Sequence, residues 1–80
     1  MRTIIIDDNK QAVKDLNERL ARFSEVEVVA AEHSGLDGLA RVSELQPDLL
    51  FLDVQLPDIS GLDFLDRLDF FTHGRCRVVM

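Results

Sequence analysis

The stretch that most constrains the fold is residues 48–61. Four apolar residues, Leu49 to Leu52, end abruptly at Asp53, and a loop containing Pro, Asp, Ser and Gly follows. A short run that is apolar at every position is typical of a strand in the middle of a parallel sheet, with helices on both faces. In open parallel sheets, ligands bind just beyond the carboxyl ends of the strands. Asp53 is therefore predicted to lie where chemistry usually takes place.

The N-terminal stretch has the same construction. Thr3 to Ile6 form an apolar, β-branched run that ends in two acids, Asp7 and Asp8, before Asn9 opens a helical pattern. If the two runs are neighbouring parallel strands, about 4.8 Å apart, their ends bring three carboxylates together. Like charges in one crevice repel each other unless a cation joins them. Oxygen ligands without a nearby His or Cys favour a hard ion, and a small, open site suits Mg²⁺.

Strands and helices are expected to alternate along the chain. The strands are predicted at residues 2–7, 26–31, 49–53 and 76–80, with the second, more polar strand at the sheet edge. A first helix is expected from Asp8 or Asn9 to about Phe23, a second from Ser34 through Leu45, and a third from Ser60, with residues 69–75 as helix end and loop. This order predicts a doubly wound α/β fold with right-handed crossovers.

The apolar periodicity also predicts which helix faces are buried. In the first helix the inward residues are expected to be Val13, Leu16, Leu20 and Phe23, and in the third Leu62, Leu65 and Leu68. His33 and His73 are isolated from other metal-ligating residues, so surface or loop positions are favoured for both.

Composition limits the kinds of partner. The chain has 80 residues, enough for one domain at most, and a formal net charge of −6. An acidic segment of this kind disfavours direct binding to nucleic acid or to an anionic membrane, since both require a basic patch. Its apolar runs are too short to span a bilayer and no signal peptide is recognisable, so a cytoplasmic location is expected. The one cysteine, Cys76, excludes an internal disulfide and is expected in the core.

Several motifs together resemble the receiver domain of bacterial two-component response regulators. They are the acidic pair Asp7 and Asp8 after an apolar strand, Asp53 after another, and the following Leu-Pro-Asp-Ile-Ser-Gly loop, residues 56–61. The resemblance extends over essentially all 80 residues, in register with the order of the elements. Residues 53–57 are more similar to regulators whose output domain is a DNA-binding domain of the LytTR type than to other response regulators.

This resemblance implies a flavodoxin-like sheet with strand order 2-1-3-4, lacking the fifth strand and last helices of the family, so that residues 1–80 form a single partial receiver domain. It implies that Asp53 accepts a phosphoryl group from a sensor histidine kinase. The expected Mg²⁺ ligands are Asp7, Asp8, Asp53 and the backbone carbonyl of Gln55. Such a domain promotes its own phosphorylation and is not a turnover enzyme.

The family also uses a Ser or Thr after the fourth strand and a Lys at the end of the fifth, and neither occurs within these residues. The segment is therefore expected to lack the usual conformational response, to leave apolar surface exposed beside the first helix, and to reach DNA only through a separate output domain.

Other interpretations remain open at this point. The acids Asp7, Asp8 and Asp53 could be polar strand ends or helix caps. The segment could be a structural fragment that forms a homodimer or a strand-swapped oligomer through its last strand. A Mg²⁺-dependent phosphohydrolase with an Asp nucleophile is disfavoured because such enzymes usually carry a second acid two residues further on, where this chain has Gln55.

Overall fold

Four strands and three helices alternate along the chain in the computed structural model, which describes residues 1–80. The elements are β1 (Arg2–Ile6), α1 (Lys10–Leu20), β2 (Glu27–Glu32), α2 (Gly35–Leu45), β3 (Leu49–Leu52), α3 (Gly61–Thr72) and β4 (Arg77–Val79). All pairings between neighbouring strands are parallel, and the sheet order is β2-β1-β3-β4. The predicted order 2-1-3-4, the edge position of the second strand and the interior position of the third are confirmed.

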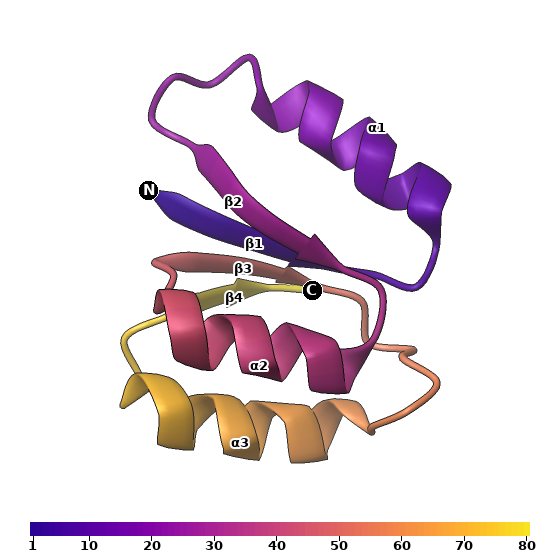
Figure 1. The fold of residues 1–80 in the computed structure, drawn as a ribbon, viewed down its shortest axis with the longest axis vertical. Coiled ribbons are helices and arrows are strands. Elements are labelled where there is room, and N and C mark those ends of the chain that lie inside the picture. Colours follow the sequence, from indigo (N-terminus) through magenta and orange to yellow (C-terminus); the bar gives the residue numbers. More distant parts are fainter.

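The sheet lies between two helical layers (Figure 1). Helices α2 and α3 run side by side on one face, and α1 covers the other. Because side chains alternate along a strand, β1 supplies both layers. Eight buried residues form the main core: Ile4, Ile6, Leu39, Val42, Leu50, Leu52, Phe64 and Leu68.

The layer on the α1 side is less completely filled. Ile5 is buried there, and a hollow of about 280 Å³ lies among Ile5, Leu16, Phe51 and Val79. Val79 is 45% exposed. Apolar surface beside the first helix is thus exposed, as the sequence predicts.

Polar caps fix where each helix begins. The Asn9 side chain accepts hydrogen bonds from the N–H groups of Gln11 and Ala12, so Asn9, not Asp8, caps α1. Ser34 and Ser60 cap α2 and α3 in the predicted positions. These side chains satisfy N–H groups that have no partner within the helix. None of the three helices combines the length and the apolar character needed to cross a membrane.

The predicted inward face of α3 is partly wrong. Leu68 is buried, but Leu62 is 79% exposed and its place in the core is taken by Phe64, which is fully buried. Residues spaced by three drift about 60° per step around a helix with 3.6 residues per turn, so Leu62, Leu65 and Leu68 do not share one narrow face. The pair Phe64 and Leu68, four apart, stays aligned on the core.

The first helix is shorter than predicted. It ends at Leu20, so Phe23 lies beyond it in a turn and is 53% exposed, whereas Val13 is buried as expected. The second strand starts and ends one residue later than predicted, the first ends at Ile6, and α3 continues to Thr72 into the segment expected to be helix end and loop. Cys76 is half-buried and packs against the core.

Candidate functional site

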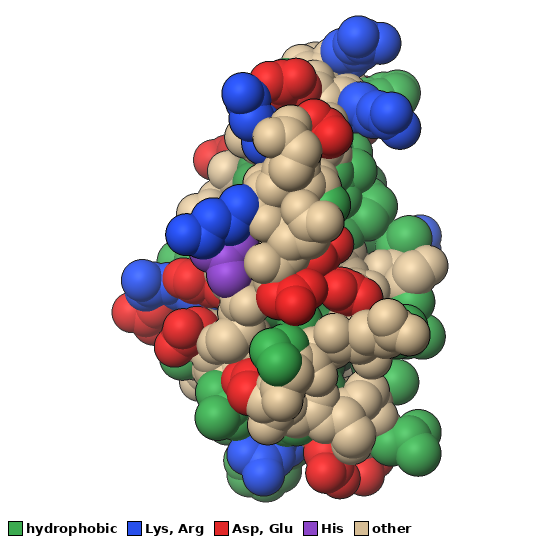
Figure 2. All heavy atoms as spheres, turned by 90° about the vertical axis from the view of Figure 1, so that its right-hand side faces the viewer, with side chains coloured by type: hydrophobic (Ala, Val, Ile, Leu, Met, Phe, Trp, Pro, Cys, Tyr) green, Lys and Arg blue, Asp and Glu red, His purple; other side chains and the backbone are tan.

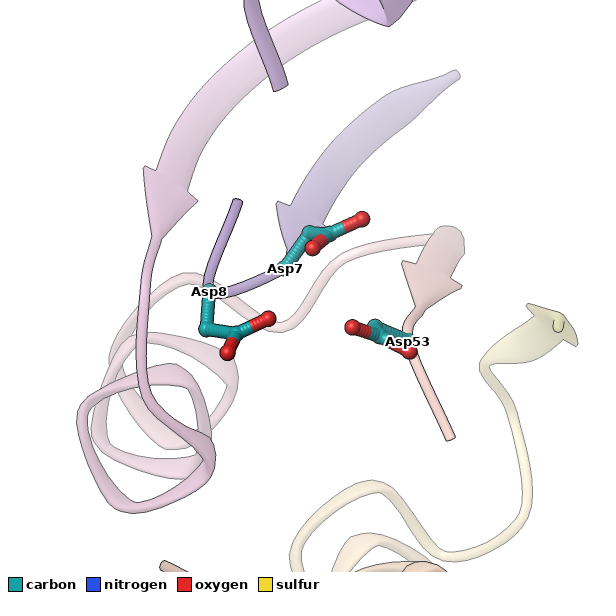
Figure 3. Close-up of side chains that lie close together, drawn as sticks. All are labelled: Asp7, Asp8 and Asp53. Carbon is teal, nitrogen blue, oxygen red and sulfur yellow. The ribbon is translucent and has the colours of Figure 1, made fainter. Parts of the chain in front are cut away.

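Three carboxylates meet at the carboxyl edge of the sheet. Asp7 and Asp8 directly follow β1, and Asp53 directly follows β3, the strand paired with β1. Figure 3 shows the three side chains converging on one space, and one carboxylate oxygen of each lies within 4.8 Å of those of the other two. Asp8 is exposed, while Asp7 and Asp53 are half-buried. The structure thus brings together all three acids that the sequence analysis selected.

The sheet itself holds the acids in place. Ile6 and Leu52, the residues before Asp7 and Asp53, are register partners in the β1–β3 ladder. The ladder continues past them, because the Asp53 N–H donates to the Ile6 carbonyl at 2.9 Å. On the other side, the Asp7 N–H donates to the Glu32 carbonyl at 3.1 Å. The spacing of the carboxylates is therefore set by main-chain hydrogen bonds.

Each half-buried carboxylate also makes one local hydrogen bond. Asp7 Oδ1 accepts from the Asn9 N–H at 2.9 Å, and Asp53 Oδ1 accepts from the Gln55 N–H at 3.0 Å. Such bonds are typical of Asx turns, so the interpretation of these acids as local turn residues accounts for one oxygen of each. It does not account for the convergence of three acids from two separate strands.

The arrangement is electrostatically unfavourable without a counterion. The pKa of the Asp7 carboxyl is raised, first because burial removes water from the charged form, and also because the Asp53 and Asp8 carboxylates lie close. The hydrogen bond from the Asn9 N–H acts in the opposite direction. Figure 2 looks onto this edge of the molecule and shows acidic side chains gathered near the middle of the face.

The donor set fits a hard divalent cation. Its ligands are oxygens, which Mg²⁺ prefers, and a site formed by few protein groups leaves room for the waters that this ion retains. Gln55, whose backbone carbonyl is the fourth predicted ligand, is exposed and starts the β3–α3 loop two residues beyond Asp53. Its N–H is bonded to Asp53, which ties the start of this loop to the acidic cluster.

Two residues near the site were not assigned to it by the sequence. His33 is exposed, as expected, and its Nδ1 lies 3.1 Å from the Asp7 carbonyl oxygen. Asp58, in the β3–α3 loop, accepts hydrogen bonds from the first two N–H groups of α2. Both contacts join segments more than 20 residues apart, and no local pattern in the sequence indicates them.

Comparison with known proteins shows the family of this chain and agrees with its fold. Residues 3–80 match the family model of the response regulator receiver domain. The chain is 39% identical over 66 residues to an uncharacterized response regulatory protein of Vibrio cholerae. The matched segment covers 82% of this chain and 28% of that protein. It is 38% identical over 69 residues to the transcriptional regulatory protein BtsR of Escherichia coli, covering 86% of this chain and 29% of that protein.

The fold is also that of solved receiver structures. The CheX–CheY–BeF3–Mg complex of Borrelia burgdorferi matches with a TM-score of 0.90 and 21% identity, over 100% of this chain and 60% of the matched chain. The chain spans less than a third of the length of the Vibrio cholerae and Escherichia coli relatives. It belongs to the receiver domains of response regulators, the phosphoryl-accepting modules of two-component signalling.

Proposed function

We propose that Asp53 accepts a phosphoryl group from the phosphohistidine of a sensor histidine kinase, and that Asp7, Asp8, Asp53 and the Gln55 carbonyl hold Mg²⁺ for this transfer. The observation that carries the proposal is the convergence of the three carboxylates at the carboxyl edge of a receiver fold. The CheX–CheY–BeF3–Mg complex, which is related in fold, contains Mg, and this supports a cation in such a site.

The chemistry requires one bond to form and one to break. A carboxylate oxygen of Asp53 attacks phosphorus, the P–N bond to the kinase histidine breaks, and the departing imidazole nitrogen takes up a proton. The product on Asp53 is a mixed anhydride, an acyl phosphate. The bond from the Gln55 N–H holds Asp53 Oδ1 and thereby fixes the orientation of the carboxylate for the attack.

Charge is the main obstacle to this reaction, since a carboxylate must approach an anionic phosphoryl group. When bound, Mg²⁺ supplies positive charge that offsets both groups. Asp7 and Asp8 hold that charge beside Asp53 without themselves reacting. The product stays attached to the chain as phospho-Asp53, so the domain would promote its own phosphorylation.

Intact mass after incubation with phosphoramidate and Mg²⁺ tests the proposal. We expect a gain of one phosphoryl group in the parent chain, none in Asp53→Asn and none without Mg²⁺. Asp69→Asn is the matched control, because it removes an exposed aspartate of α3 and should leave the gain unchanged. If neither this chain nor a response regulator that contains it gains mass, Asp53 is not an acceptor.

A second candidate is self-association through β4, which is paired only with β3. Met80, next to this edge strand, is 68% exposed, and unpaired strand edges favour pairing with another chain. A homodimer or strand-swapped oligomer should have at least twice the monomer mass in size-exclusion chromatography with light scattering. A monomer at all concentrations would rule out this association.

The cellular setting follows from the same proposal. We propose that residues 1–80 act as a single partial receiver domain in the cytoplasm, where a sensor kinase presents its histidine. The net charge of −6 disfavours direct contact with DNA by this segment, so any effect on transcription would come from an output domain. The LytTR type of that domain stays a prediction.

A further inference from the structure

The loop between β3 and α3 is attached to the N-terminus of α2. Asp58 Oδ1 accepts from the Gly35 N–H at 2.9 Å, and Asp58 Oδ2 accepts from the Leu36 N–H at 2.9 Å. These are the first two N–H groups of α2, which have no partner within the helix. Ser34 caps the third, at Asp37. Asp58 therefore completes the cap of a helix that begins 23 residues before it in the sequence.

A second, independent contact joins the same two segments. A Cβ atom added to Gly35 would lie 2.2 Å from Ile59 Cγ2 and 3.2 Å from Leu56 Cδ1. Both side chains are partly buried and pack on the main core. The loop thus lies so close to the start of α2 that only glycine fits there without movement.

These contacts hold the middle of a loop whose start belongs to the acidic site. At the start, the Asp53 N–H is bonded to Ile6 and the Gln55 N–H to Asp53. At the end, Ser60 caps α3. Between these points, residues 54–59 lie outside any regular element, and the two hydrogen bonds of Asp58 are the polar contacts that tie them to α2.

From this geometry we infer that Asp58 is a positioning residue, whose two hydrogen bonds to α2 fix the loop carrying the Gln55 carbonyl and so set the affinity of the acidic site for Mg²⁺. This inference rests on the proposed function for the identity of the cation. Asp58 touches none of the reacting groups and acts through the loop. The Leu36 and Gly35 N–H groups also lower the pKa of the Asp58 carboxyl, so the acceptor stays ionised at neutral pH.

We expect substitutions at position 58 to weaken Mg²⁺ binding in proportion to the hydrogen bonds that they remove. An asparagine has one acceptor oxygen and keeps at most one of the two bonds, whereas alanine keeps neither. Asp37→Asn is the matched control, since it removes the same charge at the same helix terminus but leaves the loop contact intact.

The first measurement is a titration of the ¹⁵N-labelled chain with MgCl2, followed by amide chemical shifts. We expect Asp58→Ala to raise the Mg²⁺ dissociation constant about 10-fold, the lower end of what outer-shell partners of metal ligands contribute. Asp58→Asn should fall between Asp58→Ala and the parent, and Asp37→Asn should match the parent. The same spectra show whether each variant is folded.

Two further readouts separate positioning from general stability. Amide hydrogen exchange of residues 54–59 should become faster in Asp58→Ala while the β1 amides stay protected. At saturating Mg²⁺, phosphorylation by phosphoramidate should reach the parent level. An unchanged Mg²⁺ dissociation constant in Asp58→Ala would overturn the inference, whether or not hydrogen exchange in the loop becomes faster.

Failure of the proposed function is distinguishable from failure of this inference. If the parent chain binds Mg²⁺ but neither it nor a response regulator that contains it gains a phosphoryl group, Asp53 is refuted as acceptor and the role of Asp58 is still decided by the titration. A parent chain that is phosphorylated, with equal Mg²⁺ affinity in all variants, refutes the role of Asp58 alone. A parent chain that binds no Mg²⁺ overturns the inference together with the metal part of the proposed function.

Discussion

Gly38 is the position where a single added methyl group tests the packing behind the site. It lies in α2 against Ile6, the fully buried residue that precedes Asp7. A Cβ atom at position 38 would lie 2.2 Å from Ile6 Cδ1, 2.8 Å from Cγ1 and 3.2 Å from Cγ2. Two of these distances are shorter than the contacts that Cβ atoms make in real structures, so Gly38→Ala forces Ile6 or the helix to move.

Two opposing effects decide the size of the change. Alanine in a helix interior is favoured over glycine by about 1 kcal/mol. Overpacking a core costs roughly 1–3 kcal/mol, and the upper part of this range applies because Ile6 has no exposed side into which it could turn. We therefore expect Gly38→Ala to lower the free energy of unfolding by about 1–2 kcal/mol.

Urea unfolding followed by circular dichroism measures this change. Gly61→Ala is the matched control, since Gly61 also lies in a helix but its added Cβ would have only one neighbour, the Val54 carbonyl oxygen at 3.9 Å. It should not lower the free energy of unfolding, and the helix propensity of alanine should raise it by up to about 1 kcal/mol.

A second variant identifies the cause as the Ile6 contact. Ile6→Val removes Cδ1, the atom nearest to the added methyl group, so the double variant should lose less stability than the sum of the two single variants. If Gly38→Ala is as stable as the parent chain, or if the two changes add, the packing argument is wrong.

Three further predictions follow from single contacts. Asp7→Asn keeps an acceptor for the Asn9 N–H but removes a charge, so without divalent cations it should stabilise the chain at neutral pH by at most about 1 kcal/mol. The pKa of Asp7 is raised in the folded state, so the free energy of unfolding of the parent should fall as the pH rises from the ordinary pKa of 3.8 through the raised pKa. Urea unfolding across this pH range should show no such fall in Asp7→Asn. Ser60→Ala removes the cap that accepts from the Asp63 N–H and should lower the free energy of unfolding by about 1 kcal/mol; an unchanged urea midpoint would contradict it. Leu50→Ala truncates a fully buried side chain in β3 and should cost about 2–5 kcal/mol in the same assay, while a loss below 1 kcal/mol would show that the site is not tightly packed.

The sequence predicted the convergence of Asp7, Asp8 and Asp53 better than some details of the fold. The positions of Asp7 and Asp53 depend on where two apolar strands end, and an abrupt change from isoleucine or leucine to aspartate marks such an end clearly. The exposure of Leu62 was not predicted in the same way, because no single residue marks which of several leucines in a helix faces the sheet. Phe64, four residues after the capping Ser60, is fully buried instead.

Contacts between distant segments were beyond the sequence for a different reason. Asp58 was assigned only to a loop, since a Pro-Asp pair is common in turns and nothing nearby shows that its partner is the start of α2. The sequence likewise places Gly35 only at the start of a helix. Its close approach to Ile59 depends on how the β3–α3 loop folds back over the sheet edge.

The fold also explains how three mutually repelling acids stay together. The acids are held together by β1, whose residues Ile4, Ile5 and Ile6 are buried and which is in register with β3 from Thr3 to Ile6. The last link of the ladder, from the Asp53 N–H to the Ile6 carbonyl, lies directly beside the charges. Repulsion among the carboxylates can rotate their side chains but cannot separate their backbones without opening this ladder. The sheet therefore keeps the three carboxylates close together in spite of their mutual repulsion, which a bound cation would relieve.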